Sequence, residues 1–299
     1  MLFRSPPADK LALHGGTPVR DLDRRPWPVW PVVSEELWRD EVEPALKATF
    51  LSAVEGLPSP RSRKFGGEMA AYCGSKFGVM VPHGTDAIAA ATAAVLDLDG
   101  WEHGGEVILP NYTFIATASA PLDRRCPLAF VDIDPETLTM CPKALEAAIR
   151  PGRTRAIIVV HLAGHPANMP EILRIADKAG IPVIEDCAQS HGAEVNGRKV
   201  GGLAKAGAFS FQSTKNLTSG EGGCVTTDDE EVRNRVVSFM DVGRQPEGRR
   251  WDYARLGWNY RPSEYLAALL SVRLRHLEAE TRRRAANAEY LGSRLREIP

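Results

Sequence analysis

The stretch FSFQSTKNLTSGEGG, residues 209–223, joins an alternating strand pattern to a single lysine, Lys215, and then to a glycine-rich loop. Most lysines are solvated surface charges. At the end of a buried strand, however, partial desolvation frees the amine lone pair for Schiff-base chemistry with a carbonyl compound. Ser210 should face the side of this strand opposite the flanking phenylalanines, and the glycines at 220, 222 and 223 would let backbone approach a ligand closely. Lys215 is therefore a candidate covalent catalyst.

A second candidate site is HGTD, residues 83–86, which follows a strand pattern and opens an alanine-rich helix pattern. The free N–H groups at a helix N-terminus favour anions, and the Thr85 hydroxyl adds a further donor. Thr85 could equally be a simple helix cap, which is the commoner role of threonine at such a position. The sequence contains neither GxGxxG nor GxxxxGK[ST] at this point, so neither a dinucleotide nor a nucleoside triphosphate is indicated.

The third candidate is VIEDCAQSHG, residues 183–192, in which an apolar strand ends in Glu185 and Asp186. A carboxylate at the carboxyl end of a strand lies where a ligand cleft forms, and it needs a cationic or N–H partner to stay charged there. A carboxylate that caps the next segment is an equally good interpretation. Gln189 follows three residues later, whereas His191 alone is typical of a structural histidine.

The elements that must position these residues alternate along the chain. Strand-like segments lie at 77–81, 106–109, 128–132, 156–161, 182–185, 208–211 and 223–227. Helix-like segments lie at 85–98, 113–121, 142–149, 169–179, 228–239 and 262–296. This alternation predicts an α/β fold in three α/β/α layers, with a mainly parallel sheet of about seven strands. Residues 1–33, rich in Pro, Arg and Trp, predict an extended arm; residues 34–240 form the large domain and 241–299 a loop and long helix.

Composition excludes several classes of protein. The 299 residues contain 37 Lys plus Arg and 38 Asp plus Glu, a formal net charge of -1, which argues against a general nucleic-acid binder. The five cysteines form no CxxC pair, and no histidine cluster has metal-ligand spacing, so no metal site is expected. The sequence shows no signal peptide and no apolar run long enough to span a bilayer, so we expect a cytoplasmic protein without a membrane partner.

Seven motifs, in order, carry a resemblance to a known family: HGTDA, PNYTFIATASA, FVDIDPETLTM, VIEDCAQSHGA, GRKVGGL, FSFQSTKNLTSGEGG and GWNYRPSE. Together they resemble the DegT/DnrJ/EryC1/StrS family of pyridoxal-phosphate aminotransferases, over residues 30–277. The resemblance implies a fold-type I large domain and a ping-pong amino transfer that uses pyridoxal 5'-phosphate. It also implies a C-terminal small domain, which we expect to be truncated in this chain because the sequence ends soon after the long helix.

The resemblance also implies roles for individual residues. Lys215 would bind the cofactor as a Schiff base and shuttle the substrate proton, and Asp186 would keep the pyridine nitrogen protonated. Gln189 matches the residue that hydrogen-bonds the ring hydroxyl, and Phe114 matches the aromatic side chain that stacks on the ring. The catalytic residues are therefore expected to be Lys215 and Asp186.

The phosphate of the cofactor would lie on Thr85, the backbone N–H of Asp86 and Ser210. Asn259, in WNYR, matches a residue that reaches the phosphate from the neighbouring subunit, so the resemblance implies a homodimer with shared active sites. His83 stands where the family commonly has a small residue, and neither its role nor that of Glu221 follows from the sequence.

The substrate expected from the resemblance is a nucleotide-linked keto-sugar, with glutamate or glutamine as the amino donor. The alternatives are a keto-cyclitol of the scyllo-inosose type or an aminohydroxybenzoate synthase reaction. The segments GGTPVR and SGEGG are similar to those of the cyclitol and aminobenzoate branch of the family. Another alternative is a non-catalytic cofactor-binding or interaction protein, because of the short C-terminus. The lysine in TKN favours amino transfer over dehydration, since dehydratase relatives carry histidine there.

Overall fold

The computed structural model describes residues 23, 30–31, 33–52, 60–98, 103–246, 249 and 251–297. The chain divides into two compact units, Met1–Ser34 and Glu35–Pro299. The predicted extended arm, 1–33, lies almost entirely outside the described residues. The predicted division of the remainder at residue 240 stays a prediction.

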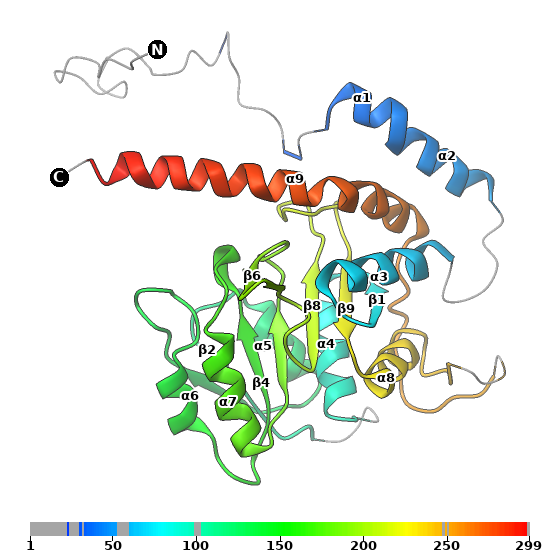
Figure 1. Ribbon diagram of the computed structural model, residues 1–299. Coiled ribbons are helices and arrows are strands. Elements are labelled where there is room, and N and C mark those ends of the chain that lie inside the picture. The colour runs from blue at the N-terminus through cyan, green and yellow to red at the C-terminus, as the bar shows by residue number, and fades with distance from the viewer. Residues whose placement is uncertain are drawn as a thin grey trace. The chain divides into compact units, whose positions relative to one another are not determined.

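A seven-stranded sheet lies at the centre of the second unit, in the order β1-β9-β8-β5-β4-β2-β3 (Figure 1). Its strands are β1 Phe77–Val81, β2 Glu106–Pro110, β3 Leu128–Val131, β4 Thr154–Val160, β5 Val183–Asp186, β8 Ala206–Ser210 and β9 Gly223–Thr227. Six of these strands run in the same direction, and β9 runs opposite to them, antiparallel to both β1 and β8. The prediction of a mainly parallel, seven-stranded sheet is therefore confirmed.

Helices cover both faces of the sheet, as predicted for three layers. One apolar core joins the sheet to α4 Gly84–Val95, α5 Ala116–Asp123 and α8 Glu230–Met240. On the other face, a second core joins it to α6 Pro142–Ala148 and α7 Met169–Ala179, and a third to α3 Pro60–Cys73 and α9 Glu264–Leu295. Short helices α1 Glu35–Leu37, η2 Trp38–Val42 and α2 Glu43–Leu51 precede these, and η3 Leu162–Gly164 follows β4.

Local signals explain several element boundaries. The Asn168 side chain accepts a hydrogen bond from the N–H of Glu171 and caps α7, which ends at Gly180 with a φ of 67°. The Asp229 carboxylate caps α8 by accepting from two N–H groups of its first turn. In the hairpin of β6 Glu194–Val195 and β7 Arg198–Lys199, the turn residues Asn196 and Gly197 both have positive φ, the geometry that an Asn-Gly pair favours.

The predicted helix at 113–121 begins later than expected, at Ala116. Residues 113–115 instead form the loop between β2 and α5, where Thr113 and Phe114 line a cavity. Helix α3 and the β6–β7 hairpin were not predicted. Gly66 in α3 lies so close to Gly78 in β1 that a Cβ on Gly66 would come 2.3 Å from the Gly78 carbonyl oxygen. This close approach lets α3 pack directly on the sheet.

Candidate active site

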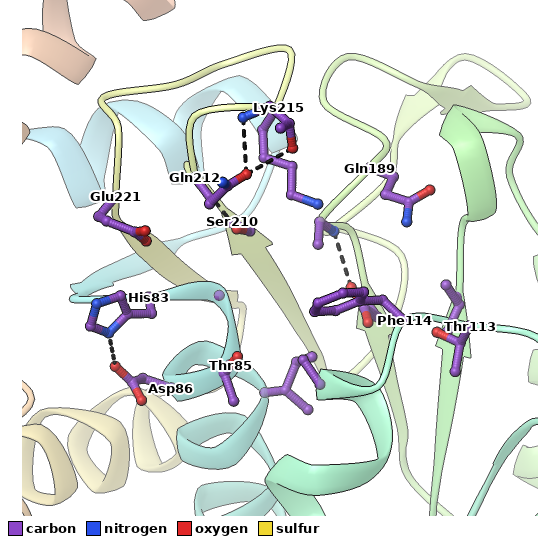
Figure 2. A pocket seen from close by; sticks show the side chains of 17 residues that line it. His83, Thr85, Asp86, Thr113, Phe114, Gln189, Ser210, Gln212, Lys215 and Glu221 are labelled. Atoms are coloured by element: carbon purple, nitrogen blue, oxygen red, sulfur yellow. Dashed lines mark hydrogen bonds and ion pairs between the residues drawn. The ribbon is translucent and has the colours of Figure 1, made fainter.

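A cavity of about 630 Å³ opens at the carboxyl ends of β4, β5 and β8 (Figure 2). This is the position at which parallel sheets usually bind ligands. Seven of the eight predicted site residues line it: Thr85, Asp86, Phe114, Asp186, Gln189, Ser210 and Lys215. The eighth, Asn259, is exposed elsewhere, where it forms an isolated β-bridge with Asp241. The structure therefore brings together residues that lie up to 130 positions apart in the sequence.

Asp186 ends β5, and its side chain is almost fully buried at the cavity. Its Oδ2 accepts a hydrogen bond of 2.7 Å from the Thr117 hydroxyl, and its Oδ1 accepts one of 3.1 Å from the Ala188 N–H. Burial raises the pKa of Asp186 above its usual value, and the hydrogen bond from Thr117 opposes that shift. A buried carboxylate in this state is stabilised by any cation that enters the cavity.

The N-terminus of α4 lies against Ser210 at another wall of the cavity. A Cβ added to Gly84 would lie 2.4 Å from the Ser210 Cβ, so only glycine permits this approach. The first backbone bond of the helix runs from the Ala87 N–H to the His83 carbonyl, and the N–H groups before it have no acceptor within the helix. With the hydroxyls of Thr85 and Ser210, these N–H groups form a cradle of donors suited to a phosphate.

Lys215 lies in a turn just beyond β8, where its backbone N–H donates to the Gln212 carbonyl over 2.9 Å. Its side chain is partly buried and points into the cavity (Figure 2), and Nζ has no hydrogen-bond acceptor within the described residues. The amine is therefore available to a ligand.

The glycines after Lys215 have close neighbours within the chain itself. A Cβ on Gly223 would lie 2.2 Å from the His83 carbonyl oxygen, and one on Gly222 would lie 3.2 Å from the Phe211 ring. Gly220 has a φ of 89°, and a Cβ there would meet nothing within 4 Å. In the chain itself they therefore permit a turn and close packing against His83, just beyond β1, and their approach to a ligand stays a prediction.

Gln189 and Phe114 lie on the side of the cavity opposite His83 (Figure 2). The Gln189 amide oxygen accepts a 2.7 Å hydrogen bond from the N–H of Ala163, which leaves the amide NH₂ free to donate into the cavity. The φ of Ala163 is 52°, in the left-handed region. Phe114 is 64% exposed, so its ring is available to stack on a flat ligand.

Glu185, next to Asp186 on β5, has a structural role that the sequence did not reveal. Its fully buried carboxylate accepts hydrogen bonds from the N–H groups of Gly201, Leu203 and Ala204. The imidazole of His161 completes this set: Nδ1 accepts from the Ala167 N–H, so Nε2 carries the hydrogen and donates to Glu185 over 3.1 Å. Glu185 thus fixes the GRKVGGL loop.

His191 is also buried, and burial lowers its pKa to about 3, which keeps it neutral.

The residues at the cavity fit pyridoxal phosphate. The buried Asp186 carboxylate suits a cationic ring nitrogen, and the cradle at Gly84 suits a phosphate. The Lys215 amine, which has no acceptor among the described residues, suits attachment to a carbonyl carbon. The cavity volume of about 630 Å³ is within the usual range for small-molecule sites.

Among the described residues, no helix is long and apolar enough to cross a membrane.

Curated relatives match nearly the whole chain. An L-glutamine:2-deoxy-scyllo-inosose aminotransferase from Streptomyces paromomycinus is 40% identical over 292 residues, which cover 94% of this chain and 67% of the relative. A protein of the same name from Streptoalloteichus tenebrarius is 38% identical over 299 residues, which cover 96% of this chain and 68% of the relative.

Solved structures match the fold. An aminotransferase from Psychrobacter cryohalolentis superposes with a TM-score of 0.80 at 34% identity, covering 88% of this chain and 67% of that chain. NtdA from Bacillus subtilis, solved with bound cofactor PMP, the amino form of pyridoxal phosphate, gives a TM-score of 0.73 at 28% identity, covering 83% and 55%. The sequence profile of the DegT/DnrJ/EryC1/StrS aminotransferase family matches residues 39–299. The chain belongs to this family and is a pyridoxal-phosphate-dependent aminotransferase.

Proposed function

We propose that the protein transfers an amino group from glutamine to a keto-cyclitol of the scyllo-inosose type. The observation that carries this proposal is the name shared by two curated relatives at 38% and 40% identity, L-glutamine:2-deoxy-scyllo-inosose aminotransferase. These names favour the keto-cyclitol over the nucleotide-linked keto-sugar that the motifs first indicated. Glutamine is likewise favoured over glutamate as the amino donor.

The chemistry of one cavity wall supports an uncharged, hydroxyl-rich acceptor. His83 and Gly222 form a β-bridge, which places Glu221 beside His83 on this wall (Figure 2). The His83 Nδ1 lies 2.8 Å from Asp86 Oδ2 and donates to it, because a carboxylate can only accept. Two carboxylates and the remaining imidazole nitrogen therefore face the hydroxyl groups that a cyclitol would donate. The Glu221 carboxylate on this wall would repel a nucleotide diphosphate.

Each residue of the cavity has a separate role in the proposed amino transfer. When bound, pyridoxal phosphate supplies a carbonyl carbon that accepts an amino group and a ring that accepts electrons from the reacting carbon. Thr85, the N–H of Asp86 and Ser210 hold the phosphate, and Phe114 and Gln189 hold the ring. Asp186 keeps a proton on the ring nitrogen, and Nζ of Lys215 moves the proton at the substrate carbon.

Asn259 is proposed to complete the cradle of a second subunit. It lies outside the cavity of its own chain, on a loop fixed by Asp241, which accepts hydrogen bonds from Arg244 and Arg261 over 2.8 and 2.9 Å. Its exposure supports a contact with a partner subunit. The proposal therefore includes a homodimer in which each site takes one residue from the partner subunit.

Amination of candidate ketones tests the proposed substrate. Protein loaded with the amino form of the cofactor is mixed with 2-deoxy-scyllo-inosose, scyllo-inosose or a nucleotide-linked keto-sugar, and the return of the carbonyl form is followed by absorbance. We expect the cyclitol ketones to react at least about 10²-fold faster at equal concentration, because the cavity wall at His83 and Glu221 accepts hydrogen bonds from their hydroxyl groups. A faster reaction with the nucleotide-linked sugar would overturn the proposal.

The variant Glu221→Gln tests whether the cavity wall at His83 and Glu221 binds the hydroxyl groups of the ketone. Glutamine keeps the size of the side chain but removes the charge that strengthens hydrogen bonds from hydroxyl groups. The KM for the cyclitol ketone should rise about tenfold, the scale of one such bond, while the KM for glutamine and the cofactor spectrum stay unchanged. Glu136→Gln, which changes an exposed glutamate outside the cavity, is the matched control. An unchanged ketone KM in Glu221→Gln would remove Glu221 from substrate recognition.

A further inference from the structure

A chain of two hydroxyl groups connects the rim of the cavity to the buried Asp186. Thr117, fully buried in the first turn of α5, lies 2.7 Å from Asp186 Oδ2, and its hydroxyl lies 2.7 Å from that of Thr113. Thr113 lines the cavity beside Phe114. Thr113 lies in the loop before α5, so the contact between the two hydroxyls joins this loop to the first turn of the helix.

The direction of these hydrogen bonds follows from the ionised state of Asp186. A carboxylate only accepts, so the single hydrogen of the Thr117 hydroxyl is committed to Asp186. The contact between the two threonines must then run from Thr113 to Thr117. Hydrogen bonds aligned in this way polarise one another, which strengthens the inner bond to the carboxylate.

Few other groups stabilise this carboxylate. Within the described residues, its hydrogen-bond donors are the Thr117 hydroxyl and the Ala188 N–H. The nearby His161 does not donate to it, because both of its ring nitrogens are engaged with Ala167 and Glu185. Among the described residues, Thr117 is thus the one side chain that donates a hydrogen bond to Asp186.

We infer that Thr117 is a positioning residue for amino transfer: it orients Asp186 and keeps it ionised against the cofactor ring, with Thr113 as its support. This inference rests on the proposed pairing of Asp186 with the ring nitrogen. Without the Thr117 hydrogen bond, a proton shared between the carboxylate and the ring nitrogen moves toward Asp186, and the ring becomes a weaker electron acceptor. Because Thr113 adjoins Phe114, one loop would carry both the side chain that stacks on the ring and the hydroxyl that supports Thr117 and, through it, Asp186.

The variant Thr117→Val tests this role, because valine has the same shape and lacks the hydroxyl. With cofactor labelled with ¹⁵N in the ring, we expect the NMR signal of the bound ring nitrogen to move toward the unprotonated position. The value of kcat should fall about tenfold, with little change in KM, since one hydrogen bond to a charged group is lost. Thr117→Ser should restore both values, and Thr113→Val should give a smaller shift in the same direction.

A matched control uses a threonine pair outside the cavity. Thr139 is buried with its hydroxyl 2.9 Å from that of Thr137, so Thr139→Val removes a similar hydroxyl without touching Asp186. A ¹⁵N signal and kcat unchanged in Thr117→Val would overturn the inference, as would an equal loss in Thr139→Val. If Asp186→Asn itself leaves the ¹⁵N signal in place, the pairing of Asp186 with the ring is wrong; if it moves the signal and Thr117→Val does not, only the role of Thr117 fails.

Discussion

Replacing Lys215 with alanine is expected to abolish steady-state amino transfer, with kcat reduced by at least about 10⁴-fold, the upper range for loss of a positioned acid–base group. The loss should be this large because no second amine can take over: Lys215 is the only lysine among the described residues that line the cavity. Its Nζ has no competing hydrogen-bond acceptor in the described part of the chain, so the substitution breaks no hydrogen bond there and removes a positive charge near Asp186. The variant should therefore fold, and it should still bind the amino form of the cofactor.

Two measurements check this expectation. Borohydride reduction of the protein with pyridoxal phosphate, followed by peptide mass analysis, should trap the cofactor on the peptide that contains Lys215. Lys178→Ala removes an exposed lysine whose partner is Glu146 and should keep full activity. Trapping on another lysine, or turnover in Lys215→Ala close to that of Lys178→Ala, would show that the amine has been misassigned.

The layers of the fold could be predicted because their signals are local. The β1 and β9 strands have the predicted bounds, and α7 carries its capping asparagine, its early proline and its final glycine in sequence order. The antiparallel β9 could not be predicted, because its direction depends on pairing with β1 and β8 across long sequence separations. Helix α3 was missed although its buried residues Phe65, Met69 and Cys73 follow helical spacing, and its close contact with β1 at Gly66 and Gly78 joins residues of two separate elements.

In the candidate site, too, residues with a local sequence signal were predictable, and residues that depend on long-range contacts were not. Asp186 and Ser210 were predictable because each ends a strand of the sheet, where ligand clefts form. The role of Thr117 was not predictable, because it depends on a contact with a residue 69 positions away in the sequence. The close packing of Gly223 was not predictable for a related reason: its neighbour, the His83 backbone, lies 140 positions earlier in the chain.

Changing Asp186 to asparagine is expected to separate stability from function. Its raised pKa means that the folded, cofactor-free protein binds a proton more tightly than the unfolded chain does. The ionised carboxylate therefore costs stability above the pKa of the unfolded state, which is about 3.9, and this cost grows as the pH rises toward the folded pKa. Asparagine removes that cost and can keep both contacts, because its oxygen accepts from Ala188 and its NH₂ donates to Thr117.

Cofactor-free Asp186→Asn should accordingly melt above the cofactor-free parent at pH 7, by about 2–4 °C for each kcal/mol gained, and the difference should shrink as the pH falls toward 4. With pyridoxal phosphate the order should reverse, because only the parent pairs a carboxylate with the cationic ring nitrogen. The value of kcat should fall about 10²–10³-fold, as when an electrostatic partner of the transition state is lost. Calorimetric scans with and without cofactor, at pH 4 and pH 7, measure both effects. If the variant gains as much stability from the cofactor as the parent does, Asp186 does not contact the ring, and the buried carboxylate serves the fold alone.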